Sequence, residues 1–146
     1  MIIEWTQLRN LAGVVAMVDG SFDPLHDGHV AYFSEATKFG RPVLCNVTSD
    51  SWTISKHPIL LPQEKRAVIL DSIRYIDFVH CAKVPTRQVL AEVKPALYLK
   101  GADWLKRGGI PSEETEICHR LNIKVHYLDT VLNSSSRLIE QVRKKI

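Results

Sequence analysis

Residues 13–36 read GVVAMVDGSFDPLHDGHVAYFSEA, and this stretch decides the fold. Its first six residues, Gly13 to Val18, are continuously apolar, as expected for a central parallel strand that is buried on both faces. Apolar residues recur at helical spacing over residues 28–39, which predicts a helix soon after the strand. The polar decapeptide 20–29 joins the two, so the stretch predicts the opening strand, loop and helix of a parallel sheet.

The rest of the chain repeats the alternation of short apolar runs and amphipathic segments. Further strands are expected at residues 42–47, 76–81, 96–99 and 125–128. Further helices are expected after Pro62, over residues 86–93, from Pro111 onward and over residues 135–145. This alternation predicts an α/β fold, a Rossmann-like doubly wound parallel sheet of five strands with helices on both faces. Ligands of such sheets bind beyond the carboxyl ends of the strands, where the strand order reverses.

Size and composition set the class of protein. The 146 residues suit one domain spanning 1–146, and 45% of them are hydrophobic, enough for an ordinary core. The net charge of +3 suits polyanionic ligands without demanding nucleic acid. Cys45, Cys81 and Cys118 are odd in number and widely spaced, which favours reduced thiols. No apolar run has membrane-spanning length, so we expect a cytoplasmic protein with no membrane partner.

The decapeptide between the first strand and the first helix is the strongest functional signal. Gly20 allows close approach of a ligand to the backbone, and a helix N-terminus offers free N–H groups to phosphate. His26 and His29 are three residues apart, so within one helical turn they share a face. Two imidazoles placed there can donate hydrogen bonds to phosphate oxygens and stabilise negative charge that builds up on a phosphate group while it reacts. The alternative is a turn with incidental histidines.

Cationic residues follow at two further points. Lys56 lies in the loop segment Lys56-His57-Pro58-Ile59, where it suits the phosphate group of a ligand or is a solvated surface lysine. Arg66, on the helix after Pro62, either contacts phosphate or pairs with a carboxylate such as Glu64.

The segment after the expected fourth strand, Lys100-Gly101-Ala102-Asp103-Trp104, combines features of a nucleotide site. Lys100 supplies charge for phosphate, Gly101 allows close backbone approach, Asp103 supplies a carboxylate and Trp104 a stacking ring. The alternative for Trp104 alone is a partly buried core aromatic.

Serines open the last expected helix. Ser134, Ser135 and Ser136 offer hydroxyls and free N–H groups that suit the phosphate groups of a ligand. Ordinary helix capping by serine is the alternative. Arg137 follows directly and is a second possible phosphate contact besides Arg66.

Residues 20–29 resemble the G-x-F-D-x-x-H-x-G-H signature of the cytidylyltransferase-like nucleotidyltransferases. The segments 56–66, 99–104 and 133–139 follow in the family's order, so the resemblance extends from about residue 13 to the C-terminus. It implies that the nucleotide site includes the following matching residues of this chain: Gly20, Ser21, Phe22, Asp23, Gly28, Gly101, Asp103, Trp104, Ser134, Ser135 and Ser136. It further implies catalytic roles for His26, His29, Lys56 and Lys100.

The lysine of the Lys100-Gly101-Ala102-Asp103-Trp104 segment favours one branch of the family. The segment is similar to the K-G-x-D-[WY] motif of the heptose-phosphate adenylyltransferases, which implies ATP and a sugar phosphate as substrates. The stretch 72–77 resembles the glycerol-phosphate cytidylyltransferases instead, which would use CTP and an alcohol phosphate. A third possibility is a regulator that binds nucleotide without turnover, because His57 and Asn133 stand where related enzymes usually have arginine.

The chemistry that the resemblance implies needs little covalent help from the protein. A phosphate oxygen of the acceptor is the nucleophile, so catalysis rests on alignment and on stabilising charge at the α-phosphate and the departing pyrophosphate. We expect Mg²⁺ to be held mainly by the triphosphate and water. Asp23 either orients a histidine or assists the metal. The expected partners are a nucleoside triphosphate, a phosphorylated small molecule and further copies of this chain as a homo-oligomer. Nucleic acid is not expected, since the basic tail Arg143-Lys144-Lys145 suits a solvated helix end.

Overall fold

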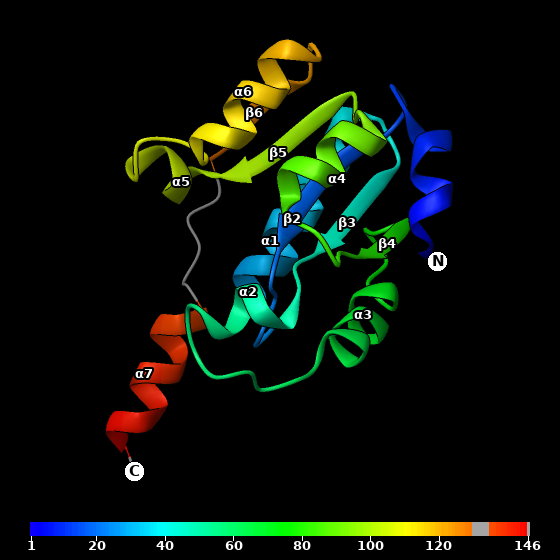
Figure 1. Ribbon diagram of the computed structural model, residues 1–146. Coiled ribbons are helices and arrows are strands. Elements are labelled where there is room, and N and C mark those ends of the chain that lie inside the picture. Colours follow the sequence, from blue (N-terminus) through cyan, green and yellow to red (C-terminus); the bar gives the residue numbers. More distant parts are fainter. Residues whose placement is uncertain (130–134, 146) are drawn as a thin grey trace.

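Strands and helices alternate along the chain, as the sequence predicts (Figure 1). The computed structural model describes residues 1–129 and 135–145, apart from the side chains of residues 135–137. The strands are β1 (Ile2–Ile3), β2 (Ala16–Gly20), β3 (Val43–Val47), β4 (Phe78–Cys81), β5 (Leu97–Gly101) and β6 (Lys124–Leu128). The helices are η1 (Trp5–Leu11), α1 (Asp27–Ala36), η2 (Thr37–Phe39), α2 (Asp50–Ile54), α3 (Gln63–Asp71), α4 (Thr86–Val93), α5 (Ala102–Lys106), α6 (Ser112–Arg120) and α7 (Ser135–Lys145).

All neighbouring strands pair in parallel, in the order β1-β4-β3-β2-β5-β6. The chain leaves β2 for β3 on one side and later returns to β5 on the other, so the strand order reverses beside β2. The doubly wound α/β prediction is therefore confirmed, with six strands rather than five. The sixth, β1, is only two residues long, and so short a strand leaves no period in the sequence.

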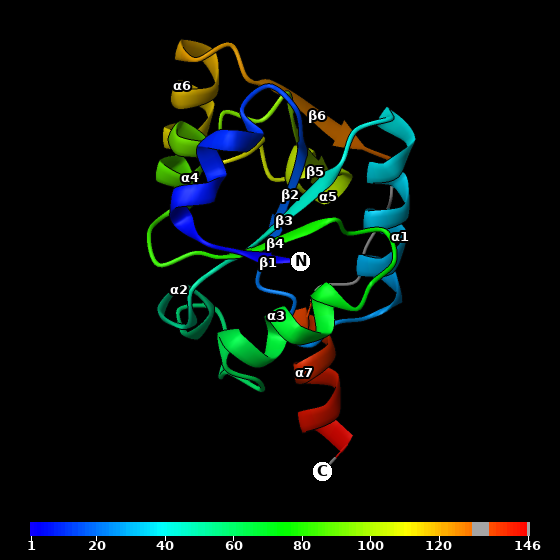
Figure 2. The same ribbon diagram turned by 90° about the vertical axis from the view of Figure 1, so that its right-hand side faces the viewer.

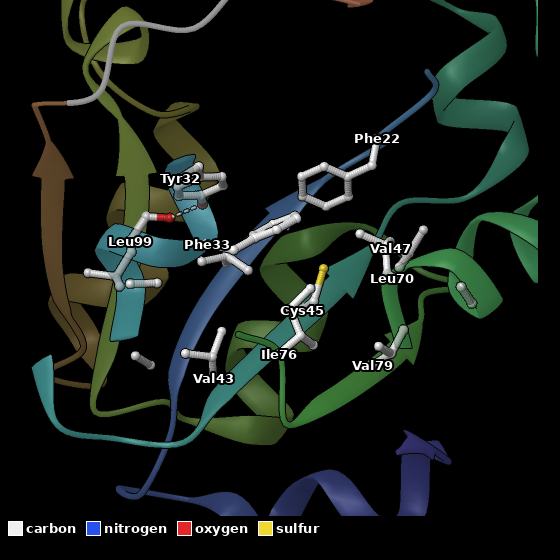
Figure 3. Packing of buried hydrophobic residues seen from close by; sticks show 14 of the residues in the cluster. Phe22, Tyr32, Phe33, Val43, Cys45, Val47, Leu70, Ile76, Val79 and Leu99 are labelled. Atoms are coloured by element: carbon white, nitrogen blue, oxygen red, sulfur yellow. Dashed lines mark hydrogen bonds between the residues drawn. The ribbon is translucent and has the colours of Figure 1, made fainter. Parts of the chain in front are cut away.

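The sheet separates two apolar layers because successive side chains of each strand point to opposite faces. Ala16 and Val18 of β2 belong to the layer that packs against α1 and α3, part of which is drawn in Figure 3. Met17 belongs to the other layer, which packs against η1, α4 and α6. Figure 2 shows α1 on one side of the sheet and α4 and α6 on the other. None of the helices in the described part of the chain is long and apolar enough to cross a membrane.

Two predicted boundaries shift for local reasons. The first strand begins at Ala16 rather than Gly13, because Gly13 has a φ of 71° and its N–H donates to the carbonyl of Lys94. The strand then continues through Asp19 and Gly20, which pair with β3 although one is charged. The helix expected over residues 28–39 ends as an α-helix at Ala36 and continues as the 3₁₀ turn η2.

Candidate nucleotide-binding site

A cleft of about 440 Å³ lies at the carboxyl ends of β2 and β5, where the strand order reverses. Most of the predicted site residues line it: Gly20, Ser21, Phe22, His29, Lys56, Lys100, Gly101, Asp103 and Trp104. These residues come from separate segments of the sequence, which the parallel topology brings to one edge of the sheet. Four predicted residues are not part of the lining: Asp23, His26, Gly28 and Arg66. Ser134 lies outside the described residues, as do the side chains of Ser135, Ser136 and Arg137.

Gly20 is required by packing within the loop that follows β2. A Cβ atom at this position would lie 2.9 Å from the ring of Phe22. That ring is buried and meets Phe33 edge-on, with ring centroids 5.1 Å apart, and His29 in the same manner at 5.0 Å. The absent side chain therefore lets an aromatic residue fold back under the cleft and support the histidine.

The two histidines share one face at the start of α1, as their spacing predicts. Their rings stack with centroids 3.7 Å apart. His26 caps the helix, since its Nδ1 accepts from the N–H of Gly28 at 3.1 Å, while its own N–H donates to Nδ1 of His29 at 3.2 Å. Because Nδ1 of His29 accepts, a neutral ring carries its proton on Nε2. Burial, and secondarily the charge of His26, lowers the pKa of His29 to about 3, so the ring in the cleft is a neutral donor.

Asp23 connects two loops beside the cleft. Its carboxylate is buried and accepts from the backbone N–H groups of Leu60 and Leu61, at 2.8 and 3.0 Å. It thus fastens the loop before α3 to the loop after β2, and its described hydrogen bonds go to neither histidine. The physical reason is that two consecutive N–H groups of a loop need acceptors, and a buried carboxylate supplies both.

Arg66 is likewise an internal fastener. Its side chain is 1% exposed and donates to the carbonyls of Ser21, Thr48 and Leu61, at 2.7, 3.2 and 3.0 Å. It also pairs with Asp50 at 2.6 Å, so of the two alternatives the carboxylate pair fits the geometry, with Asp50 in place of Glu64. A guanidinium whose donors are used in this way has little left for a phosphate.

Three cations surround the indole of Trp104. Nζ of Lys100 lies 4.6 Å from the ring centroid and Nζ of Lys56 lies 5.7 Å from it. The guanidinium carbon of Arg107 lies 5.2 Å away. Loss of solvent around its ammonium lowers the pKa of Lys56 first, and the positive charges of Lys100 and Arg107 lower it further. Like charges gathered around one ring favour the binding of a polyanion, which would relieve their mutual repulsion.

Three charged residues that line the cleft were not singled out as site residues from the sequence, namely Asp19, Arg107 and Glu114. Asp19 is 9% exposed and pairs with Lys100 across 3.5 Å. Glu114 accepts from the hydroxyl of Tyr98 at 2.6 Å, and burial followed by the charge of Asp19 raises the pKa of Glu114. A signal for Asp19 exists, because a carboxylate directly follows the apolar run of the first strand. Arg107 gives no comparable signal, since it follows a short helix without amphipathic period.

A second cavity of about 530 Å³ adjoins the cleft. The two share five lining residues, namely Thr48, Trp52, Thr86, Pro111 and Glu114. Lys83 and Arg87 bring positive charge to the second cavity, and Ser49, Ser51 and Ser55 bring hydroxyl groups. Two connected cavities with cations in both can hold two anionic molecules side by side.

Comparison with known proteins identifies the family. The family model described as "Cytidylyltransferase-like" matches residues 17–141. The "Bifunctional protein HldE" of Yersinia pestis (strain Pestoides F) is 35% identical in an alignment of 113 residues that covers 74% of this chain and 24% of that protein. The same protein of Yersinia pseudotuberculosis serotype O:1b (strain IP 31758) matches equally. The chain therefore spans about a quarter of the length of these curated relatives.

Solved structures support the fold. A lipopolysaccharide core biosynthesis protein from Thermoplasma volcanium GSS1 has a TM-score of 0.67 at 22% identity, covering 82% of this chain and 98% of that one. Pantothenate synthetase from Thermus thermophilus has a TM-score of 0.64 at 16% identity, covering 99% and 70%. The sheet, the cleft at its switch point and the family match together define a nucleotidyltransferase-type protein. The chain belongs to the cytidylyltransferase-like family.

Proposed function

We propose that this protein transfers a nucleoside monophosphate from a nucleoside triphosphate, with ATP preferred, to a sugar phosphate and releases pyrophosphate. The observation that carries the proposal is the cationic cleft: Lys56, Lys100 and Arg107 surround Trp104 beside the neutral donor His29. The positive charges of this arrangement suit a polyphosphate. The neutral ring of His29 can donate a hydrogen bond to it without first being protonated. The preference for ATP and a sugar phosphate rests on the likeness of residues 100–104 to the heptose-type motif.

In the reaction, an oxygen of the acceptor phosphate attacks the α-phosphorus of the triphosphate. The new P–O bond forms as the bond from the α-phosphorus to the bridging oxygen breaks, and pyrophosphate leaves with that electron pair. Lys56, Lys100 and Arg107 bind the phosphates and offset the charge that develops on the leaving group. The Nε2–H of His29 donates to a phosphate oxygen, and burial of the ring keeps it in the neutral form.

The carboxylates of the cleft fit a magnesium ion that the nucleotide brings. Asp103 lines the cleft, is partly exposed and pairs with Arg107 across 3.6 Å at the surface, whereas the partners of Asp19 and Glu114 are the more buried Lys100 and Tyr98. No group of three acidic, histidine or cysteine side chains that could hold a metal is found in the described ranges. Asp103 would therefore supply one oxygen ligand, with the phosphates and water supplying the others. When bound, Mg²⁺ would neutralise phosphate charge.

The second cavity is the proposed place of the acceptor. It opens into the cleft at Thr86 and Glu114, so a molecule there has access to the triphosphate. Arg87 and Lys83 suit an anionic group, and the surrounding hydroxyls suit a hydroxylated molecule such as a sugar. This division gives the two substrates separate but connected sites.

The test is a pyrophosphate-release assay with Mg²⁺ that crosses ATP, CTP, GTP and UTP with a panel of sugar and alcohol phosphates. Release with ATP and a sugar phosphate is expected. Release only with CTP and glycerol phosphate or another alcohol phosphate would favour the cytidylyltransferase alternative. Nucleotide binding without release across the panel would favour the catalytically inactive regulator.

A matched pair of lysine variants ties the activity to the cleft. Lys100→Met removes a cation that lines the cleft, and turnover should fall by ~10²–10³. Lys106→Met removes the same charge a short way further along the chain, at an exposed residue outside the lining, and should keep the wild-type rate. Equal rates for the two variants would refute the assignment of Lys100.

A further inference from the structure

Three polar side chains cross the sheet in one row. Asp19, Asn46 and His80 occupy register-paired positions of the adjacent strands β2, β3 and β4. They are 9%, 0% and 3% exposed, respectively. Central strands of a parallel sheet are normally apolar on both faces, and buried polar groups are costly unless they are hydrogen-bonded. We call these three residues the polar row.

The hydrogen bonds of the polar row run in one direction. An ionised carboxylate only accepts, so Asn46 must present its Nδ2 to Oδ1 of Asp19, at 2.8 Å. Oδ1 of Asn46 then faces Nδ1 of His80 at 2.8 Å, and this nitrogen must carry the proton. Every donor in the row therefore points toward Asp19.

At the end of the polar row that is remote from the cleft, His80 lies against the N-terminal segment. His80 pairs with Ile3 of β1, and its ring lies 5.9 Å from that of Trp5 in η1. Burial, and then the charge of Lys83, lowers the pKa of His80 to about 4. The ring is therefore neutral at physiological pH, and its single N–H proton is on Nδ1, which faces Asn46.

The near end of the polar row reaches the cleft. Asp19 also accepts from the hydroxyl of Thr86, at 3.2 and 3.3 Å to its two oxygens, and pairs with Nζ of Lys100 at 3.5 Å. Lys100 is only 4% exposed, and a buried ammonium depends on a nearby negative charge. Aligned donors strengthen one another and stabilise a carboxylate as an anion. Asn46 and His80 themselves lie outside the lining of the cleft.

We propose that Asn46, supported by His80, is a positioning residue that acts through Asp19 on Lys100. It holds the Asp19 carboxylate in the place that keeps the Lys100 ammonium in the lining of the cleft. The inference rests on the proposed function in one respect, namely that Lys100 contacts phosphate. It assigns a task to two residues that no motif of the sequence singled out.

Two substitutions of Asn46 test the proposal, with inorganic pyrophosphate as the probe and calorimetry as the measurement. Asn46→Val removes the donor but keeps a strand-compatible side chain, and should weaken pyrophosphate binding about tenfold. Asn46→Asp keeps the shape but replaces the donor with a second acceptor beside Asp19, and should weaken binding at least as much. Leu44→Val is the matched control, because Leu44 is buried on the same face of β3 without belonging to the polar row. Its affinity should stay within about twofold of wild type, as expected of a core change remote from the ligand.

A second background separates positioning from general damage to the fold. In Lys100→Met the route from Asn46 to phosphate is removed, so adding Asn46→Val should change pyrophosphate affinity little further. The same loss in both backgrounds would show that Asn46 acts by another route and would overturn the inference. If Asn46→Val does not fold, His80→Phe provides the test, because it removes the donor to Asn46. About a threefold loss of affinity is then expected, and only when Lys100 is present.

The outcomes separate the two proposals. Wild-type protein that binds neither pyrophosphate nor any nucleoside triphosphate would overturn the proposed function, and this inference with it. Wild-type binding that both Asn46 variants retain in full would overturn the inference alone. Weakened binding in the Asn46 variants, preserved binding in Leu44→Val and loss of the effect without Lys100 would support it.

Discussion

At the scale of single residues, His29 is the side chain whose chemistry is most closely fixed by its surroundings. One ring nitrogen is occupied by a backbone N–H, and the ring is packed between Phe22 and His26. The remaining Nε2–H is directed by this packing rather than by a flexible chain. Such a preorganised donor is worth more to a transition state than the same group in water.

We therefore expect His29→Ala to lower turnover by ~10²–10³ while the protein stays folded. Val30→Ala, at the next and exposed position of α1, should retain the wild-type rate and serves as the control. Steady-state pyrophosphate release gives the rates, and circular dichroism monitors the fold. A His29→Ala variant with most of the wild-type turnover would remove this residue from the mechanism.

Arg87 tests the proposal that the second cavity binds the acceptor phosphate. It is exposed at the start of α4 and contributes positive charge to the second cavity. Arg87→Met should raise the KM for the acceptor phosphate about tenfold and leave the KM for the nucleoside triphosphate unchanged, because it removes a charge-assisted contact to one substrate only. Arg120→Met, on α6 and outside both cavities, is the control. A rise in the KM for the nucleotide instead would place the two substrates the other way round.

At the scale of elements, Arg66 of α3 joins three loops that border the cleft. Removing it leaves the carbonyls of Ser21, Thr48 and Leu61 without their donor and Asp50 without its partner. Arg66→Met should lower the free energy of unfolding by about 3 kcal/mol, chiefly because three backbone carbonyls lose their hydrogen-bond donor.

Urea denaturation at neutral pH measures the loss, and Arg74→Met is the control. Arg74 is exposed and contacts the neighbouring Tyr75, so its removal should cost less than about 1 kcal/mol. Arg66→Met that is fully stable yet binds nucleotide poorly would restore the interpretation of Arg66 as a phosphate ligand.

The elements that the sequence reveals are those with a clear hydrophobic period. Residues 43–47 form a strand because five consecutive buried residues leave no solvent face, and residues 86–93 form a helix because Val89, Leu90 and Val93 share a side. The five-residue helix α5 escaped prediction, since so short a helix contains no repeat. It nevertheless carries Asp103 and Trp104 into the cleft.

The site was predictable to the extent that its residues follow strands in recognisable order. Lys100 and His29 could be located from the sequence because each lies in a motif next to a strand end. The partners of Asp23 and Arg66 could not, because they are backbone groups of distant loops whose positions depend on the tertiary structure. The homo-oligomer, the identity of the base and the role of Ser135 and Ser136 stay predictions.

At the scale of the whole molecule, two buried histidines make stability depend on pH. The folded protein holds His29 and His80 neutral, with pKa values lowered from 6.5 to about 3 and about 4. As the pH falls below 6.5, the unfolded chain binds protons that the folded chain rejects, so the free energy of unfolding decreases. This contribution to stability is fully present above pH 6.5. It is lost progressively toward about pH 4 for His80 and about pH 3 for His29, by up to about 1 kcal/mol per pH unit for each histidine.

Urea denaturation at about pH 7, 6 and 5 measures this slope. His80→Gln should flatten it, since one of the two titrating groups is gone, whereas His119→Gln, which changes an exposed histidine, should leave it as in wild type. Equal unfolding free energies at the two ends of this range would contradict the neutral, buried state of both rings.

Because Gly20 leaves no room for a side chain beside Phe22, the protein is sensitive to any substitution at this position. One methyl group added there would act as a wedge against Phe22, and because that ring also touches Phe33 and His29, the push would be shared between the core and the cleft. We expect so small a change to displace the Phe22 ring and lower activity while most of the sheet still forms. We therefore expect natural relatives to vary less at this position than at the charged residues of the cleft. Some of those charged residues lie beside others of the same sign, which can replace part of the lost charge.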